Sequence, residues 1–348
     1  MSKKPFFTGP FAPICESYVA QKRASGLDYN QQAKLLRLFD NFCKDYEIQS
    51  YTITKEIALT WCKKRPNEAD ATRYSRVSEM QRFAQYLCKQ GYPSYLLPAL
   101  PKCGEQHVPY IFSTDELHLI FERLDSLSPT NLSPNRHLTM PLLFRVLYGC
   151  GLRISEALAL LKNDVDLKDG ILHIRHGKND RERIVPMSAT LTEECRKYAQ
   201  AVHKNTVEST PFFYAKGGTP YTKSTIGKFF RGILWDVGIP YKGKQFGPRV
   251  HDLRHTFCCH NIQKWAEAGL PIYSNLLILS RYVGHTSISS TQYYLRLTAQ
   301  SFPHIMDICE QNLGGMYAPF DLALDREGLQ DGSSWTDFFC QSVIKIFL

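Results

Sequence analysis

The stretch RVHDLRHTFCCH, from Arg249 to His260, decides how the second half of this sequence folds and what it can do. Its apolar residues recur at helical spacing, which predicts a helix from His251 to about Ala268. Positions three apart lie on one face of a helix, so His251 and Arg254 can reach the same ligand, with His255 directly beside them. A polar helix face is most often only solvated, so a functional interpretation needs support from elsewhere in the chain.

Length and composition favour a two-domain protein. The chain has 348 residues, 43% of them hydrophobic, which is enough for more than one buried core. It has no run of roughly eighteen apolar residues, and its N-terminus, MSKKPFFTGP, lacks the apolar segment of a secretion signal, so we expect a soluble, cytoplasmic protein. The eleven cysteines are then reduced thiols, and without a CxxC pair they indicate buried apolar positions rather than a metal site.

Positive charge is concentrated away from the C-terminus. The formal net charge is +9, and residues 1–104 hold 16 Lys and Arg against 9 Asp and Glu, whereas residues 311–348 hold 2 against 5. Surplus cations gain affinity for nucleic acid by releasing counterions from its phosphates, so a polyanionic partner is expected. Six cations of the first hundred residues are candidate DNA contacts, the alternative being plain solvation: Lys63, Lys64, Arg65, Arg73, Arg76 and Arg82.

The first hundred residues predict a compact helical unit. Apolar spacing indicates four helices, over Cys15–Ser25, Gln31–Tyr46, Thr54–Lys64 and Ala71–Gln90. The stretch that follows contains prolines and a Gly-Glu-Gln run that does not continue a helix. We therefore expect a helical domain over residues 1–98, a linker over 99–111, a second domain over 112–310 and a tail over 311–348.

The second domain is expected to be mostly α-helical with one small antiparallel β-sheet. Ser113-Thr-Asp-Glu116 matches a capping box that opens a helix running to about Leu127. The runs ILHIR and RERIVPM flank HGKND between Gly170 and Met187 and predict a β-hairpin. No series of alternating strands and helices occurs. Further helices are expected over Thr139–Tyr148, with Pro141 in its first turn, and over Ala189–Lys204, Lys223–Val237 and Ser274–Val283.

Four residues elsewhere accompany the opening stretch. GLRISEAL places Arg153 at a helix start, HGKND places Lys178 at the hairpin turn, and VGHTSISSTQYY contains His285 and, nine residues later, Tyr294. Each of these residues alone is more often structural than catalytic, so only their combination indicates a functional site.

The order and spacing of these residues resemble the tyrosine recombinase family, which includes phage integrases and the Xer- and Cre-type enzymes. The family's first arginine box is matched by Gly151-Leu-Arg-Ile-Ser-Glu-Ala-Leu158, its hairpin lysine by Lys178, and its H-x-L-R-H-T box by His251-Asp-Leu-Arg-His-Thr256. Val283-Gly-His285 matches its L-G-H box with valine in place of leucine, and Tyr294 stands at the position of its nucleophile. The helices before the linker are also similar to the family's core-binding domain, by composition rather than by motif.

The resemblance implies both an architecture and a reaction. It implies a four-helix, SAM-like core-binding domain before an α+β catalytic domain, acting on double-stranded DNA recombination sites. It further implies a 3′-phosphotyrosine intermediate, a Holliday junction, and a homotetramer on two duplexes that forms from monomers or weak oligomers. Accessory DNA-bending proteins and association with the nucleoid would fit. The implied catalytic residues are Arg153, Lys178, His251, Arg254, His285 and Tyr294.

Phosphodiester chemistry independently requires these residue types. Two guanidiniums, Arg153 and Arg254, can bind the oxygens that gain charge in the transition state without losing their protons. A tyrosine has a pKa of about 10, so its attack needs a base or a cationic pocket, and the leaving oxygen needs a proton. His251 and Lys178 suit those two roles. Because a phosphotyrosine conserves the energy of the broken bond, no metal and no cofactor is expected.

Neighbouring residues have plainer interpretations. Tyr293 is the competing phenol, but adjacent helical residues point about 100° apart, so only one of the two can face the phosphate. Gly284 is suited to end the helix before Tyr294, and Thr286 or Ser287 to cap a new helix after it. Glu156 is expected to pair or cap within the fold, and His255 to hydrogen-bond to the site rather than transfer protons.

These features favour a site-specific DNA recombinase, the integrase or transposase of a mobile element. The alternatives with the same chemistry are a Xer-like dimer resolvase and a type IB topoisomerase. A catalytically silent DNA-binding regulator is a third alternative, which the intact residue set disfavours. Tail residues 338–348 include apolar side chains that could pack on a neighbouring subunit. The alternatives are packing on their own domain and disorder.

Overall fold

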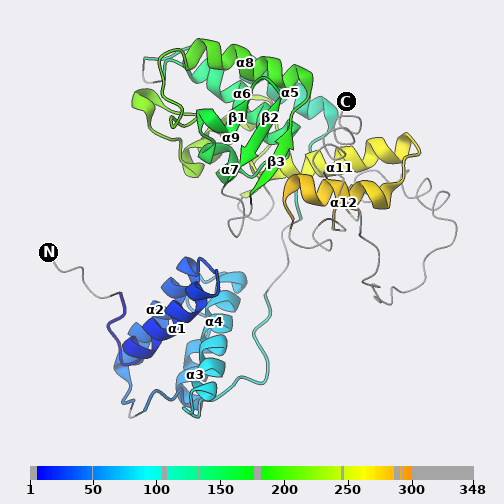
Figure 1. The fold of residues 1–348 in the computed structure, drawn as a ribbon. Coiled ribbons are helices and arrows are strands. Elements are labelled where there is room, and N and C mark those ends of the chain that lie inside the picture. Colours follow the sequence, from blue (N-terminus) through cyan, green and yellow to red (C-terminus); the bar gives the residue numbers. More distant parts are fainter. Residues whose placement is uncertain are drawn as a thin grey trace, which may run out of the picture. The chain divides into compact units, whose positions relative to one another are not determined.

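The computed structural model describes residues 6–48, 50–103, 108–131, 133–175, 182–243, 247–285, 291, 293–295 and 297–298. The chain divides into two units, residues 1–107 and 108–348 (Figure 1). The boundary falls within the stretch 99–111, for which the sequence predicts a linker. The tail, residues 311–348, lies outside the described residues.

The described part of the first unit consists of four helices around an aromatic core. Phe39 and Trp61 pack edge to face with ring centroids 5.2 Å apart, a favourable arrangement for aromatic pairs. Phe83 is fully buried in the same core. The predicted helices are confirmed, with shifted ends: α1 (Ala12–Ala24), α2 (Asn30–Phe42) with the 3-10 turn η1 (Cys43–Asp45), α3 (Lys55–Cys62) and α4 (Asp70–Lys89).

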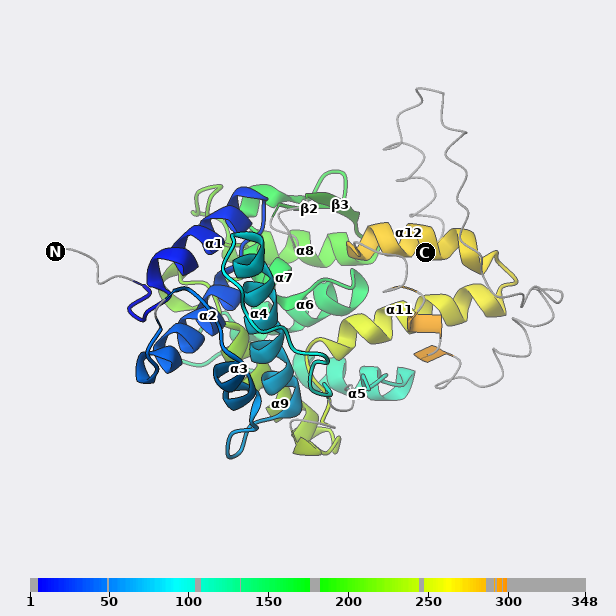
Figure 2. The ribbon, with the colours of Figure 1, turned by 90° about the horizontal axis from the view of Figure 1, so that it is seen from below.

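The second unit has a separate hydrophobic core enclosed mainly by helices. In its described part these are α5 (Thr114–Asp125), α6 (Arg136–Gly149), α7 (Ile154–Ala159), α8 (Ala189–Val202), α9 (Lys223–Asp236), α11 (Asp252–Glu267) and α12 (Ile272–Val283), with the 3-10 turns η2 (Lys162–Asp164) and η3 (Lys216–Gly218). Helices α11 and α12 lie side by side (Figures 1 and 2). Residues 252–260 of the opening stretch therefore lie in α11, which contacts both α6 and α12, and residues 249–251 directly precede it.

A three-stranded antiparallel sheet stands where the hairpin is predicted. Its strands, in the order β1-β2-β3, are β1 (Val165–Asp166), β2 (Ile171–Ile174) and β3 (Arg183–Pro186). Ile174 pairs with Arg183 at the end of the β2–β3 ladder, so β3 begins with that arginine. The sequence does not predict β1, because two residues are too few to show an alternating pattern.

Two helix starts differ in how well the sequence predicts them. Ser113 accepts a hydrogen bond from the backbone N–H of Glu116, whose carboxylate in turn accepts one from the N–H of Ser113, so the predicted capping box is present. Helix α6, in contrast, begins at Arg136 rather than Thr139. Pro141 is consequently inside the helix and not in its first turn, where the missing N–H would have cost nothing.

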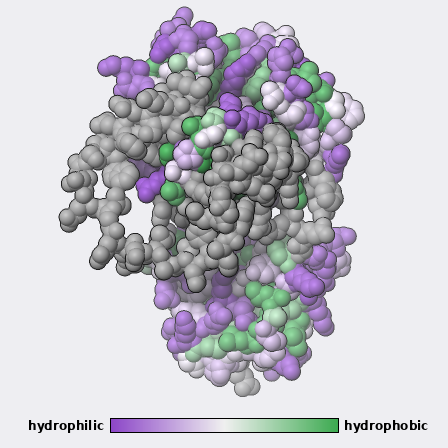
Figure 3. Space-filling view, turned by 90° about the vertical axis from the view of Figure 1, so that its right-hand side faces the viewer, coloured by the Kyte–Doolittle hydropathy of each residue, from purple (hydrophilic) through white to green (hydrophobic). Residues whose placement is uncertain are grey.

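One face of the molecule is of mixed polarity where its residues are coloured (Figure 3). On the face shown in Figure 3, hydrophilic residues alternate with smaller hydrophobic patches. Within the described residues, none of the helices has the length and apolar character needed to span a bilayer.

Candidate active site

The C-terminal end of α12 is where several of the sequence-predicted site residues meet. Gly284 follows the helix in a left-handed conformation, with φ of 70°. The last carbonyls of a helix have no partner within it and carry the negative end of its dipole. Three arginines donate to consecutive carbonyl oxygens here: Arg183 Nε to Tyr282 at 2.9 Å, Arg254 Nη2 to Val283 at 2.6 Å, and Arg153 Nη2 to Gly284 at 3.2 Å.

Arg254 links this helix end to the turn that carries Arg153. Its Nη1 donates to the carbonyl oxygen of Gly151 at 2.7 Å, and Arg153 is the N-cap residue of α7, two positions later. Gly151 has φ of 57°, and a Cβ there would lie 2.5 Å from Cδ1 of Phe257, so the turn needs glycine. Arg254 is only 1% exposed, whereas the side chain of Arg153 is 21% exposed. Arg153 is thus the more accessible of the two predicted phosphate-binding cations.

Glu156 holds Arg153 in place from the first turn of α7. Its carboxylate accepts from Nη1 of Arg153 at 2.7 Å and from the backbone N–H of Arg153 at 2.9 Å. Arg183 donates to both oxygens of the same carboxylate, at 3.1 and 2.8 Å. Burial favours the neutral acid, but the hydrogen bonds and charge of Arg183, together with the hydrogen bonds of Arg153, outweigh it and lower the pKa of Glu156 to about 2. The predicted role of Glu156, pairing within the fold, agrees with these contacts.

Aromatic rings from α11 and from the segment after α12 form a continuous row. The rings of His251 and His255 are 4.8 Å apart, and the ring of Tyr294 is 5.5 Å from that of His255. The imidazole of His285 stacks on Tyr294 with centroids 5.7 Å apart and an interplanar angle of 12°. His285 Nδ1 also lies 2.9 Å from Oγ1 of Thr291. The structure therefore brings both predicted histidines and the predicted nucleophile into one cluster.

The two predicted catalytic histidines are neutral at physiological pH. Surrounding protein and the positive charges of Arg254 and Arg153 lower the pKa of His251 to about 4, although this residue keeps an exposed side. Burial and the same two arginines lower the pKa of His285 to about 3. A neutral imidazole can accept a proton, so His251 is poised as a base near pH 7.

Tyr294 is sequestered in this structure. Its side chain is 3% exposed, and burial, followed by the neighbouring Cys258, raises the pKa of the phenol far above its usual range. Arg254 acts in the opposite direction, through its charge and a hydrogen bond to the phenol. The contact with Arg254 places the tyrosine beside one of the two predicted phosphate-binding cations. Tyr293, the competing phenol, is half-buried against the hydrophobic core.

Lys178 lies outside the described residues, in the sequence between β2 and β3. The same holds for Thr286 and Ser287, for which the sequence suggests a role in capping the next helix. The hairpin lysine therefore stays a prediction, and only the strands that precede and follow it are placed.

In the first unit, Arg76 is not the DNA contact that the sequence suggests. Its side chain is 2% exposed and forms an ion pair with Glu68, with Nε 2.6 Å from Oε1. The guanidinium also donates to the carbonyl oxygens of Trp61 and Lys63. The charge of this arginine is thus paired with the carboxylate of Glu68 inside the fold.

The other five candidate DNA contacts differ in their exposure and in whether they have a partner within the first unit. Lys63 is exposed, and Arg82 is 56% exposed while bound to Glu79 at 3.1 Å. The remaining three each have a partner within the unit: Lys64 pairs with Asp70 at 2.6 Å, Arg65 lies over the ring of Trp61, and Arg73 donates to the carbonyl of Cys62 at 2.8 Å.

Sequence reasoning missed Arg183, which the structure places within the network of Glu156 and α12. The only signal was its position in the basic strand RERIVPM, directly after the hairpin. Nothing in that strand indicates that the arginine points into the protein, because its partners are 27 and 99 positions away.

Comparisons with known proteins agree with the residue pattern. The sequence profile of the phage integrase family matches residues 113–301. The protein y4rB of Sinorhizobium fredii is 30% identical over 295 residues, covering 82% of this chain and 92% of that protein.

Two solved structures share the fold. One is the XerH site-specific recombinase bound to a palindromic difH substrate, with a TM-score of 0.60, 19% identity, and coverage of 85% of this chain and 84% of that one. The other is the Tn1549 transposon integrase in complex with transposon right end DNA, with a TM-score of 0.55, 17% identity, and coverage of 84% and 99%.

Proposed function

We propose, from the membership of this chain in the phage integrase family of tyrosine recombinases, which cleave and rejoin DNA, that it performs site-specific recombination. Its role in that case is the integrase or transposase of a mobile element. The substrate is double-stranded DNA carrying a recombination site, to which the XerH and Tn1549 proteins are bound in their own structures. Exchange would proceed through a Holliday junction in a tetramer on two duplexes.

One observation carries the proposal. Arg153 and Arg254, which lie 101 positions apart in the chain, both donate to the end of α12, and the phenol of Tyr294 contacts Arg254. A nucleophile and two permanent cations in such proximity match a phosphoryl transfer, in which charge develops on oxygens near the attacking atom. Neutral His251 beside them supplies a proton acceptor.

The proposed reaction has two proton transfers. The oxygen of Tyr294 attacks the scissile phosphorus while His251 takes the phenolic proton, and the bond from phosphorus to the 5′ oxygen breaks. Lys178 donates a proton to that oxygen, so the products are a 3′-phosphotyrosine and a free 5′-hydroxyl. Arg153 and Arg254 bind the nonbridging oxygens throughout. The raised pKa keeps the phenol of Tyr294 neutral in this structure, so its attack needs a proton acceptor such as His251.

The covalent intermediate provides the decisive test. Nicked suicide duplexes from the flanks of the genetic element that encodes the chain release a short fragment after cleavage, which leaves the protein attached to DNA. We expect a covalent adduct with the unaltered protein and with Tyr293→Phe, and none with Tyr294→Phe. Adduct formation by Tyr294→Phe would refute the assignment of the nucleophile.

A second assay separates strand exchange from the other reactions of this chemistry. Two differently labelled duplexes carrying the site are incubated with the protein, and recombinant products are resolved on a gel. Exchange between them supports recombination, whereas relaxation of supercoiled DNA without exchange indicates a topoisomerase. DNA binding without any adduct would indicate a silent regulator and would contradict the proposal.

A further inference from the structure

We propose that Arg183 is a positioning residue of the active site, which locks the Arg153–Glu156 pair to the end of α12 and so fixes Arg153 relative to His285. This inference rests on the proposed function and deepens it. Arg183 need not touch DNA in this role, because it acts through the groups that it holds.

The contacts of Arg183 join three elements of the second unit. It begins β3, its two terminal nitrogens bind both oxygens of Glu156 on α7, and its Nε binds the carbonyl oxygen of Tyr282 on α12. Its side chain is 11% exposed, and that of Glu156 is 1% exposed. Few waters can therefore replace these bonds if the guanidinium is removed.

The guanidinium of Arg183 occupies the space next to Gly284 where a side chain would begin. A Cβ at Gly284 would lie 2.9 Å from Nη1 and 3.0 Å from Cζ of Arg183. Gly284 also accepts from Arg153 and directly precedes His285. Displacing Arg183 would therefore disturb Arg153 through Glu156 and His285 through the backbone at the end of α12.

Lysine could not replace this arginine. The planar guanidinium donates to a carboxylate and a carbonyl in fixed directions at the same time, whereas an ammonium is a single centre of charge. Arg183→Lys would keep the positive charge beside Glu156 but could not span the distance to Tyr282 with the same geometry. Charge and geometry are therefore separable by experiment.

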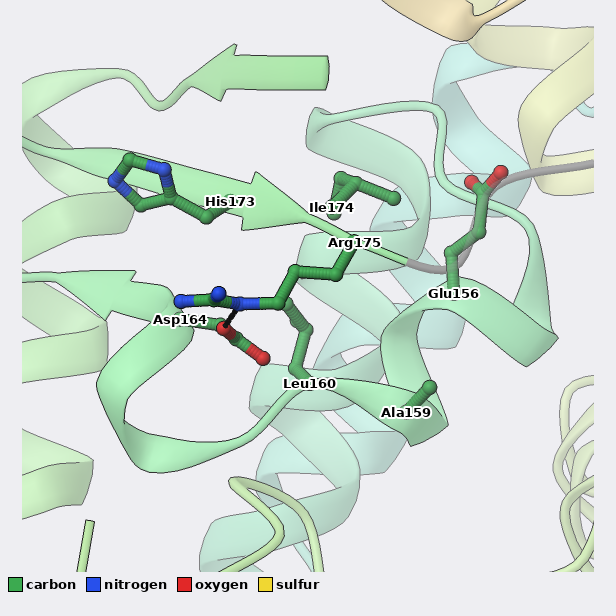
Figure 4. A pocket seen from close by; sticks show the side chains of 7 residues that line it. All are labelled: Glu156, Ala159, Leu160, Asp164, His173, Ile174 and Arg175. Atoms are coloured by element: carbon green, nitrogen blue, oxygen red, sulfur yellow. Dashed lines mark hydrogen bonds and ion pairs between the residues drawn. The ribbon is translucent and has the colours of Figure 1, made fainter. Parts of the chain in front are cut away.

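Arg175, on the opposite side of the hairpin, is a suitable control. It forms an ion pair with Asp164, and its side chain is 51% exposed. Figure 4 shows this pair at one end of a small pocket, whose other end is formed by Glu156. The pocket has a volume of about 10 Å³, too little for anything larger than a water molecule. Arg175→Gln therefore removes an arginine–carboxylate ion pair of the same hairpin in which neither Arg153 nor α12 takes part.

The first readout is the rate of single-turnover cleavage on the suicide duplex, with DNA affinity and thermal stability measured alongside. Misplacing a catalytic group by about 1 Å can cost ~100-fold in rate, so Arg183→Gln is expected to lose about that factor. Arg183→Lys should recover only part of it, and Arg175→Gln should cleave as the unaltered protein does. DNA affinity should stay unchanged in all three variants.

The second readout is the pH profile of cleavage, which a merely stabilising residue would not move. Glu156 faces Arg153, at the start of α7, and Arg183 on β3. Its carboxylate in turn raises the pKa values of Arg254, on α11, and of His251, directly before α11, although the net shift of both groups is downward. Arg183 lowers the pKa of Glu156 more than Arg153 does. If Arg183 is removed, the effect of burial is less opposed and the pKa of Glu156 rises. The carboxylate is then lost as pH falls through that higher value. We expect the acid limb of Arg183→Gln to begin at a higher pH than that of the unaltered protein.

Hydrogen exchange of the backbone gives a readout that does not depend on activity. Peptides covering the end of α12 and His285 should exchange faster in Arg183→Gln than in Arg175→Gln. Unchanged exchange, or a cleavage rate and pH profile equal to those of the unaltered protein, would overturn the positioning role. If the unaltered protein forms no adduct, the proposed function fails, and the exchange measurement alone then decides whether Arg183 holds the helix end.

Discussion

At the scale of single residues, burial lowers the pKa of Arg254 and of both site histidines, but it leaves them in different protonation states. A guanidinium keeps its proton in nearly any environment, so Arg254 remains a cation although it is 1% exposed. An imidazole loses its proton readily, and beside Arg254 and Arg153 both His251 and His285 are neutral. Burial and the neighbouring positive charges thus place permanent cations beside neutral imidazoles that can accept a proton.

The lowered histidine pKa values predict how stability depends on pH. Unfolded histidine has a pKa of about 6.5, so between that value and the lowered values of His251 and His285 the unfolded chain binds more protons than the folded one. The free energy of unfolding should therefore be highest above about pH 6.5 and should fall as pH is lowered below it. Urea denaturation at a series of pH values measures this slope.

Single substitutions assign that slope to the site. His285→Asn should make stability less dependent on pH between about 4 and 6.5, because one of the two neutral histidines is gone. His118, on α5, has a side chain that is 73% exposed, so His118→Asn serves as the surface control for the loss of a histidine. A slope that is equally steep in His285→Asn would contradict the neutral state assigned to His285.

At the scale of elements, the end of α12 depends on glycine for two separate reasons. Gly269, after α11, and Gly284, after α12, both have a left-handed backbone, with φ of 65° and 70°. A Cβ at Gly269 would meet nothing within 4 Å, whereas one at Gly284 would press on Arg183. The pair therefore separates the cost of the backbone conformation from the cost of the contact.

Alanine at each glycine tests this distinction. A left-handed conformation costs a non-glycine residue about 1–2 kcal/mol, so both Gly269→Ala and Gly284→Ala should lose roughly that much free energy of unfolding. Only Gly284→Ala should also lose cleavage, since only there is Arg183 displaced. Chemical denaturation and single-turnover cleavage, measured on both variants, provide the comparison. Equal cleavage by the two would show that the contact with Arg183 has no catalytic consequence.

Elements determined by local sequence are those that could be predicted. The capping box at Ser113 and Glu116 needs two side chains three positions apart, and a hairpin needs only alternation and a turn. The position of Pro141 within α6 and the pairing of Arg183 with Glu156 depend on how distant segments pack. Neither feature produces a periodic pattern in the sequence. The motifs of the site could therefore be predicted, but the network of contacts that holds their side chains could not.

At the scale of the whole molecule, each unit has its own hydrophobic core, so the charges of the first unit can be examined without reference to the second. A count of lysines and arginines treats Arg76 and Lys63 alike. In the structure Arg76 is buried in an ion pair with Glu68, whereas Lys63 is exposed. The net charge of a unit thus predicts a polyanionic partner but does not identify which cations meet it.

This difference predicts opposite effects for two substitutions of like charge in the full-length chain. Lys63→Gln should weaken binding to a nonspecific duplex and reduce the slope of log affinity against log salt by about 1, since one phosphate contact is lost, while the thermal midpoint stays constant. Arg76→Gln leaves Glu68 buried and unpaired, which costs roughly 3–5 kcal/mol of stability. Titrations at several salt concentrations, together with thermal denaturation, measure both quantities. If Arg76→Gln kept full stability and lowered only the salt slope, Arg76 would be a DNA contact after all, and the assignment made from its burial would be wrong.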